Sequence, residues 1–220
     1  HERWTDVFNV PFTAPGWQGP DVFGEISEER MIEFERRRHM AGSLRERILF
    51  LPCATSKVND MGLFAYPACY QLEASLKMDA AVAGRWEIEV LPFTPPHSRP
   101  MAYWDRLWER ILYDVQSRAP RVVAFSLYGW SLEPSLRLAR ALRVSLPGTL
   151  LLAGGPEVTE REDFVDRWDV FDVLIEGDGE VPLAALLRRL AAGEEIAGIP
   201  STSWRDAHGW HHAPRSRCET

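Results

Sequence analysis

The fold is decided by three segments, RVVAFSLYGW at residues 121–130, LLLAGGP at 150–156 and VFDVLIEGDGE at 170–180. Each contains an apolar run of strand length that breaks into Ser, Gly or Pro, and helical patterns fill the gaps between the runs. This alternation predicts a βαβαβ order, and hence a parallel sheet with both faces covered by helices. Ligands of such sheets bind beyond the carboxyl ends of the strands, so we expect the functional residues in the turns that follow these runs.

The same rhythm continues upstream and downstream of these segments. Two further strands are predicted at 48–51 and 86–91, and Glu87 and Glu89 alternate with apolar residues as in a strand at or near a sheet edge. A small hairpin is predicted between residues 201 and 212. The predicted helices are residues 66–83, a helix with an apolar stripe from Trp104 to Val115, one that Ser131 caps, a short helix at 160–168 and a last one at 181–193.

Together these elements predict an α/β fold, a Rossmann-like (flavodoxin-like) five-stranded parallel sheet with flanking helices, plus an N-terminal arm and a C-terminal small hairpin. Residues 1–44 lack the βα rhythm and are expected to form an arm with a charged helix. Residues 45–198 are expected to form the Rossmann-like domain. Residues 199–220 are expected to form a linker hairpin and tail that lead into a further domain.

Composition excludes several classes of protein. The chain has 220 residues, 45% of them hydrophobic, which is enough for one sizeable core. A net charge of −7 argues against a nucleic-acid surface, and no apolar run approaches the roughly 20 residues of a membrane span. The three cysteines form no disulfide framework, and no signal peptide is apparent, so we expect a cytoplasmic protein.

The usual catalytic and phosphate-binding motifs are absent from the sequence. It has no G-x-G-x-x-G after the first strand, no G-x-x-x-x-G-K-[ST] and no G-x-S-x-G. The pair His211-His212 is better read as part of a hairpin than as a metal site. What remains is a binding site at the strand ends, where Ser126 offers a hydroxyl and Gly154 and Gly155 let a ligand approach the backbone, unless the two glycines only form a tight turn.

The three segments, taken in order, resemble the cobalamin-binding domain that precedes the catalytic barrel in cobalamin-dependent radical S-adenosylmethionine enzymes. The matching motifs are VAFSLYGW at 123–130, LLAGGPEV at 151–158 and DVLIEGDGE at 172–180. The resemblance extends over about residues 45–212 and includes the closing hairpin. It implies that the chain binds cobalamin.

The resemblance also implies a set of site residues. In the wider cobalamin-binding fold, a D-x-H-x-x-G loop after the first strand supplies a His ligand to cobalt. Here Lys57 and Asn59 stand at the Asp and His positions, which implies base-off cobalamin with no protein His ligand and no protein residue assigned to the metal. The implied cofactor-binding residues are Asn59, Asp60, Met61 and Gly62 in that loop, Ser126, Gly154 and Gly155 around the nucleotide tail, and Leu127, Tyr128, Gly129, Trp130, Pro156, Glu176, Gly177 and Gly179 at the borders.

One part of the family pattern is absent. Cys53, Cys69 and Cys218 do not form the C-x-x-x-C-x-x-C motif that holds a [4Fe–4S] cluster and S-adenosylmethionine. We therefore expect no catalytic residue in this chain, and we expect the cluster and S-adenosylmethionine in a radical barrel, in the same natural chain or in a partner. The favoured hypothesis is a cobalamin-binding module of a radical methyltransferase. The alternatives are a free-standing cobalamin carrier or sensor and an α/β domain for a nucleotide or flavin.

Overall fold

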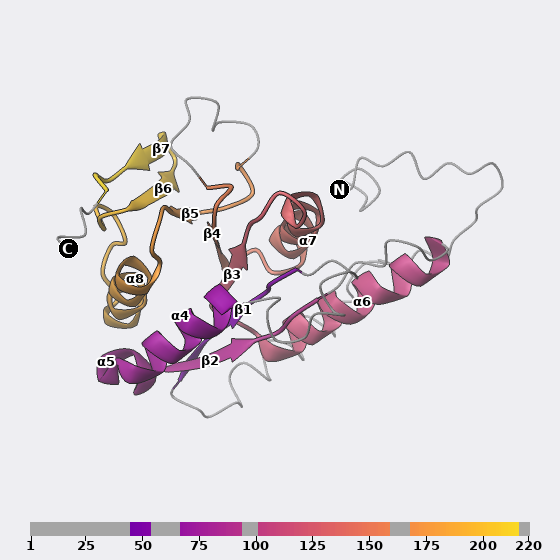
Figure 1. The fold of residues 1–220 in the computed structure, drawn as a ribbon, viewed down its shortest axis with the longest axis horizontal. Helices are drawn as coiled ribbons and strands as arrows, with labels where there is room; N and C mark the ends of the chain where they lie inside the picture. Colours follow the sequence, from indigo (N-terminus) through magenta and orange to yellow (C-terminus); the bar gives the residue numbers. More distant parts are fainter. Residues whose placement is uncertain (1–44, 54–66, 94–100, 159–167, 216–220) are drawn as a thin grey trace.

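A seven-stranded mixed sheet organises the part of the chain that the computed structural model describes, which is residues 45–53, 67–93, 101–158 and 168–215. The strand order is β2-β1-β3-β4-β5-β6-β7 (Figure 1). The first five strands in this order are parallel, and the hairpin β6–β7 joins β5 in antiparallel pairing. The strands are β1 Glu46–Phe50, β2 Trp86–Val90, β3 Val122–Ser126, β4 Leu150–Gly154, β5 Val173–Ile175, β6 Thr202–Asp206 and β7 Gly209–His212.

Helices cover both faces of the sheet. One face packs against α6 and α7, and the other packs against α4, α5 and α8, so that two separate clusters of buried apolar side chains form. Alternate strand residues point to opposite faces and supply both clusters. The helices are α4 Pro67–Met78, α5 Ala80–Ala83, α6 Met101–Arg118, α7 Leu132–Ser145 and α8 Glu180–Ala192.

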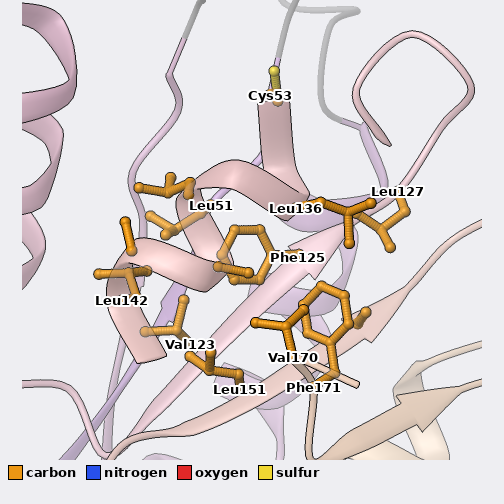
Figure 2. Close-up of a cluster of buried hydrophobic side chains, with 14 of the residues drawn as sticks. Leu51, Cys53, Val123, Phe125, Leu127, Leu136, Leu142, Leu151, Val170 and Phe171 are labelled. Atoms are coloured by element: carbon orange, nitrogen blue, oxygen red, sulfur yellow. The ribbon is translucent and has the colours of Figure 1, made fainter. Parts of the chain in front are cut away.

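The larger cluster lies between the sheet and α7 (Figure 2). Val123 and Phe125 of β3 and Leu136 and Leu142 of α7 contribute side chains to it. Phe125 meets Phe171 edge to face, with ring centroids 5.6 Å apart. The β3 strand is therefore fixed from this face, while its carboxyl end is left free to present residues to the other.

The fold expected from the sequence is confirmed. The five predicted parallel strands and the hairpin are present, and β2 lies at the edge of the sheet, as the exposed Glu87 indicates. The apolar stripe of α6 is buried at Ile111, Leu112 and Val115. The hairpin extends the sheet beyond β5 rather than standing apart from it.

Two element boundaries differ from the prediction. The helix predicted at 66–83 is broken after Met78, because Asp79 accepts hydrogen bonds from the amides of Ala81 and Val82 and so begins a new helix. The last parallel strand begins at Val173 rather than Val170, because the preceding residues form a turn.

Several expectations fall outside the described residues. They are the arm at 1–44, the loop that contains Asn59, Asp60, Met61 and Gly62, and the helix at 160–168 apart from its last residue. Among the helices that the structure describes, none combines the length and the apolar character of a membrane span.

Candidate functional site

A cavity of about 180 Å³ opens at the carboxyl ends of the parallel strands, between α4 and α8. It lies on the face opposite the cluster of Figure 2. Its walls come from five segments: Phe50 of β1; Ala68, Cys69, Gln71 and Leu72 of α4; Ala124 to Ser126 and Tyr128 around the end of β3; Leu152, Gly154 and Gly155 around the end of β4; and Ile175, Gly177, Asp178, Gly179, Glu180 and Leu183 from β5 to α8.

The parallel register brings the key residues together. Ser126 pairs with Gly154, and Ala124 pairs with Leu152 two residues earlier in the same strands. Because side chains alternate across a sheet, all four positions face α4 and α8. The cavity therefore has an apolar inner end, a hydroxyl above it and a residue without a side chain next to that hydroxyl.

The two glycines at the end of β4, Gly154 in the strand and Gly155 directly after it, have different roles. Gly155 has a φ of +105°, and a Cβ there would lie 2.6 Å from the carbonyl oxygen of Leu127. The amide of Leu127 donates to the carbonyl of Gly154 at 2.7 Å, which explains this close approach. At Gly154 a Cβ would meet Ile175 no closer than 3.5 Å, an ordinary contact. The tight turn therefore requires glycine at 155, whereas glycine at 154 only leaves room in the cavity.

Ser126 is paired with a buried thiol. Cys69, in the first turn of α4, is 1% exposed and its side chain hydrogen-bonds to Ser126. Burial raises the pKa of the Cys69 thiol to about 12, and the hydrogen bond to Ser126 only partly opposes this effect. The thiol is therefore neutral at physiological pH, and it is not an activated nucleophile.

The loop after β3 is held by Ser131. Its side chain makes no cap hydrogen bond to α7, contrary to the prediction. Instead the Ser131 hydroxyl accepts from the amide of Tyr128 at 2.8 Å, and it is within reach of the carbonyls of Ser126 and Tyr128 for its own proton. The Ser131 hydroxyl therefore bonds to backbone groups of the preceding loop instead of capping α7.

An aromatic pair stands at the rim of the cavity. The ring of Tyr128 stacks on that of Trp130, with centroids 4.7 Å apart and planes 13° from parallel. Tyr128 lines the cavity, while Trp130 is 54% exposed. The rim on this side is therefore flat and apolar.

The opposite rim is supported by the hairpin. The amide of Glu176 donates to the carbonyl of Ser201 at 2.9 Å, and the guanidinium of Arg215 packs on the backbone of Gly177, where a Cβ would lie 2.7 Å from Nη2. The Glu176 side chain is buried and lies 3.5 Å from the hydroxyl of Ser203, which in turn is 2.7 Å from Nδ1 of His212. Glu176 therefore joins the hairpin to the cavity wall.

Some of the residues implied by the resemblance meet at the cavity and others do not. Ser126, Tyr128, Gly154, Gly155, Gly177 and Gly179 line it. Among the described residues the lining does not include Leu127, Gly129, Trp130, Pro156 or Glu176, which lie in the flanking turns. The positions of Asn59, Asp60, Met61 and Gly62 are outside the described part of the chain.

The residues of the inner cavity walls were not among those expected from the sequence. Ala124 and Leu152 precede Ser126 and Gly154 by two residues, so strand alternation places them on the same face and could have identified them. Cys69 and Leu72 lie three residues apart in α4, as expected for one helix face, but no pattern showed which face turned toward the strand ends.

Two known proteins with related sequences are methyltransferases. The chain is 38% identical over 97 residues to 2-(S-pantetheinyl)-carbapenam-3-carboxylate methyltransferase from Streptantibioticus cattleyicolor, a match that covers 43% of this chain and 14% of that protein. It is 34% identical over 88 residues to the cobalamin-dependent radical SAM methyltransferase TokK from Streptomyces tokunonensis, covering 39% of this chain and 13% of that protein. The matches thus span a small part of either relative.

A solved structure has the same fold. The cobalamin-dependent S-adenosylmethionine radical enzyme OxsB, with aqua-cobalamin and S-adenosylmethionine bound, matches with a TM-score of 0.57 and 12% identity, over 82% of this chain and 24% of that one. At this level of identity the likeness concerns the fold.

The family match covers most, but not all, of the segments that line the cavity. The B12 binding domain family matches residues 72–187, which is more than half of the 220 residues. The matched segment runs from the middle of α4 into α8 and so includes part of each helix beside the cavity and the ends of β3, β4 and β5. Phe50 and the first turn of α4, with Cys69, lie before it. The chain belongs to the family of B12-binding domains.

Proposed function

We propose that the cavity receives the nucleotide tail of cobalamin in its base-off form, while the corrin ring lies over the carboxyl ends of the parallel strands. The observation that carries this proposal is a cavity between α4 and α8 that opens at the strand ends, with apolar walls and the Ser126 hydroxyl beside Gly154. This is the location at which open α/β sheets bind ligands.

The cavity fits the tail in size and chemistry. An apolar cavity of roughly 150 Å³ holds a benzene ring, so the 180 Å³ found here admits an aromatic base and not a corrin. Phe50, Leu152 and Ile175 provide apolar contact surface for such a base, and Ser126 provides one polar contact. The corrin ring then rests outside, next to the stacked pair of Tyr128 and Trp130.

The rim residues match the periphery of the corrin. Its amide side chains carry N–H donors, and the carboxylates of Asp178 and Glu180 at the rim are acceptors for them. Gly177 and Gly179 keep side chains away from this edge, since Arg215 and Leu72 fill the space beside them. The chain's own residues thus bind and orient the cofactor.

We extend the proposal to the loop below the cobalt. Asn59, Asp60 and Met61 are the candidates for the residue that faces the metal, and no His stands at the ligating position. The family match begins at residue 72, downstream of this loop, so the proposal rests on the sequence of the loop alone.

For the whole protein we propose a cobalamin-dependent radical S-adenosylmethionine methyltransferase, because both curated relatives are methyltransferases and one of them is of this type. When bound, the cobalt would carry a methyl group from a sulfonium donor toward an unactivated carbon or phosphorus. Residues 45–198 would form the binding domain, with 1–44 as an arm and 199–220 as the link to a radical barrel that holds the [4Fe–4S] cluster and S-adenosylmethionine.

The test is a titration of the purified chain with hydroxocobalamin, followed by absorbance. We expect tight binding with a base-off spectrum that persists when each of the six His is replaced in turn. Ser126→Trp should fill the cavity and weaken binding by at least about 100-fold, since it blocks the tail. Ser117→Trp, at an exposed site near the end of α6, is the matched control and should bind normally.

Each outcome decides one part of the proposal. Equal binding by the Ser126 and Ser117 variants would exclude the cavity as the tail site. A spectrum that depends on one His would reject the loop assignment and keep the cavity. For the whole protein, the complete gene product supplied with isotopically labelled S-adenosylmethionine should form labelled methylcobalamin, and no label on cobalamin would reject the methyltransferase.

A further inference from the structure

The inner part of the cavity offers very few hydrogen-bonding groups. Phe50, Ala124, Leu152, Ile175 and Leu183, all less than 5% exposed, form its apolar walls. The acidic side chains that line it, Asp178 and Glu180, belong to the loop before α8 and the first residue of that helix, at the more exposed rim. Gln71, which is exposed, and Tyr128, which stacks on the exposed Trp130, also lie at the rim. Of the lining side chains that the structure describes, this leaves Cys69 and Ser126 as the polar groups beside the apolar walls.

These two side chains form one unit. The Cys69 thiol and the Ser126 hydroxyl are hydrogen-bonded to each other, and the thiol is neutral because burial raises its pKa to about 12. A thiol is a weak donor and a weak acceptor, whereas a hydroxyl has one proton and two lone pairs. Paired with the thiol, the Ser126 hydroxyl can make one good hydrogen bond to a ligand. The pair has little capacity for a second hydrogen bond.

Cobamides differ in the base of their nucleotide tail. A benzimidazole base in the base-off form has one free ring nitrogen, whereas a purine base such as adenine has several ring nitrogens and an exocyclic amine. In an apolar cavity each polar atom without a partner carries a desolvation penalty that weakens binding by roughly 10- to 100-fold. An interior with one hydrogen-bonding unit therefore matches the benzimidazole and not the purine.

We propose that this cavity selects cobamides with a benzimidazole-type base over those with a purine base, and that Cys69 is a specificity-determining residue that acts through Ser126. The inference rests on the proposed function, since it requires the tail to enter the cavity. Cys69 contributes twice: it occupies the wall beside Ser126 with an almost apolar group, and its hydrogen bond uses part of the bonding capacity of the hydroxyl.

The experiment compares dissociation constants of three ligands: cobalamin, the adenine-base cobamide and cobinamide, which lacks the nucleotide tail. For the unmodified chain we expect the adenine form to bind about 10- to 100-fold more weakly than cobalamin. Cys69→Ser places a second strong hydrogen-bonding group in the interior and should reduce this ratio by about 10-fold or more. Cys69→Ala is a second variant, for the case that a buried serine impairs folding. It frees the Ser126 hydroxyl without adding a polar group, so it should also lower the ratio, by less than Cys69→Ser does, and an unchanged ratio would reject the role of Cys69.

Cys53→Ser is the matched control. Cys53 is also buried and also has its pKa raised to about 12, but it belongs to the cluster on the opposite face of the sheet. Its substitution should leave the ratio between the two cobamides unchanged. A purely structural effect of replacing a buried thiol would appear in both the Cys69 and the Cys53 variants. A change in the ratio of the two dissociation constants is expected only in the Cys69 variants.

The outcomes separate this inference from the proposed function. If cobinamide binds as tightly as cobalamin, the tail makes no contact and the proposed function fails. If cobalamin binds more tightly than cobinamide but the adenine-base cobamide binds as tightly as cobalamin, the tail does enter the cavity, and the proposed selection for a benzimidazole base is wrong. If selection exists but Cys69→Ser leaves the ratio unchanged, the role of Cys69 is wrong.

Discussion

At the scale of single residues, the adjacent glycines at the end of β4 differ in what they serve: Gly155 is needed for the fold, and Gly154 leaves space for a ligand. Gly155 has a left-handed backbone and lies against the main chain of Leu127, whereas Gly154 faces the cavity with an ordinary distance to Ile175. Backbone geometry therefore accounts for one glycine, and space for a ligand accounts for the other. Two residues of the same type, side by side, carry different constraints.

We predict opposite results for the two alanine substitutions. Gly155→Ala should lower the free energy of unfolding by more than about 1 kcal/mol, because a Cβ at a φ of +105° also collides with the Leu127 carbonyl. Gly154→Ala should leave stability equal or raise it by up to about 1 kcal/mol, yet weaken cobalamin binding. Urea unfolding and cobalamin titration of both variants measure this, and an equal loss of stability would contradict it.

The sequence identified the residues at this site unevenly, for a physical reason. Ser126 and Gly154 end apolar runs, and the ends of parallel strands meet by rule, so their proximity was predictable. Cys69 comes from a helix, and its rotation is set by packing of Leu76 and other α4 residues on the sheet. No short sequence motif encodes that packing.

At the scale of elements, Asp79 connects the two helices beside the cavity. It begins α5, directly after α4, by accepting from the amides of Ala81 and Val82 at 3.1 and 3.2 Å, and it pairs with Arg188 of α8. The hydrogen bond to Arg188 is the main cause that lowers the pKa of Asp79. The region of α4 and α5 is thus linked to α8 at the end away from the ligand.

We predict that Asp79→Ala reduces the free energy of unfolding by about 1 kcal/mol through loss of the cap, measured by urea unfolding at neutral pH. Arg188→Ala should have a smaller effect, because the Arg188 side chain is 52% exposed and the ion pair is screened. Because the folded pKa of Asp79 is lowered, its contribution should be lost as the pH falls below about 3.8, the ordinary value of the carboxyl. A larger loss from Arg188→Ala than from Asp79→Ala would reverse this ranking.

The boundary of an element was predictable where a single residue marks it, and it was not predictable where an apolar run continues past the end of the strand. Gly193, with its positive φ, ends α8 as the sequence indicated. The start of β5 was misplaced because residues 168–170 form a turn, although the sequence there is largely apolar. Asp172 follows this turn; its amide donates to the carbonyl of Leu151, and its side chain accepts from the amide of Leu151 and from Arg143. An apolar run shows that residues are buried but does not show where pairing begins.

At the scale of the whole molecule, the sheet separates two cores, and each core holds one buried thiol. Cys53 belongs to the cluster with α6 and α7, and Cys69 to the cluster with α4 and α8. The alternation of strands and helices predicted this layered arrangement, because a parallel sheet needs cover on both faces. The thiols therefore report on the two faces separately.

The two buried thiols should make the folded chain less stable at alkaline pH. Burial raises the pKa of each thiol from 9.0 to about 12, so between these values the folded chain holds two protons that the unfolded chain releases. The free energy of unfolding should then fall as the pH rises from about 9 to about 12, by up to roughly 1.4 kcal/mol per pH unit for each thiol. Below pH 9 both thiols are protonated in either state and contribute no slope.

Substitution isolates these contributions from those of lysines and tyrosines, which titrate in the same range. Cys53→Ala and Cys69→Ala should each remove one share of the slope measured by urea unfolding between pH 9 and 11, and the double variant should remove both. A slope that is the same in the double variant and the unmodified chain would show that neither thiol is held neutral in the folded core.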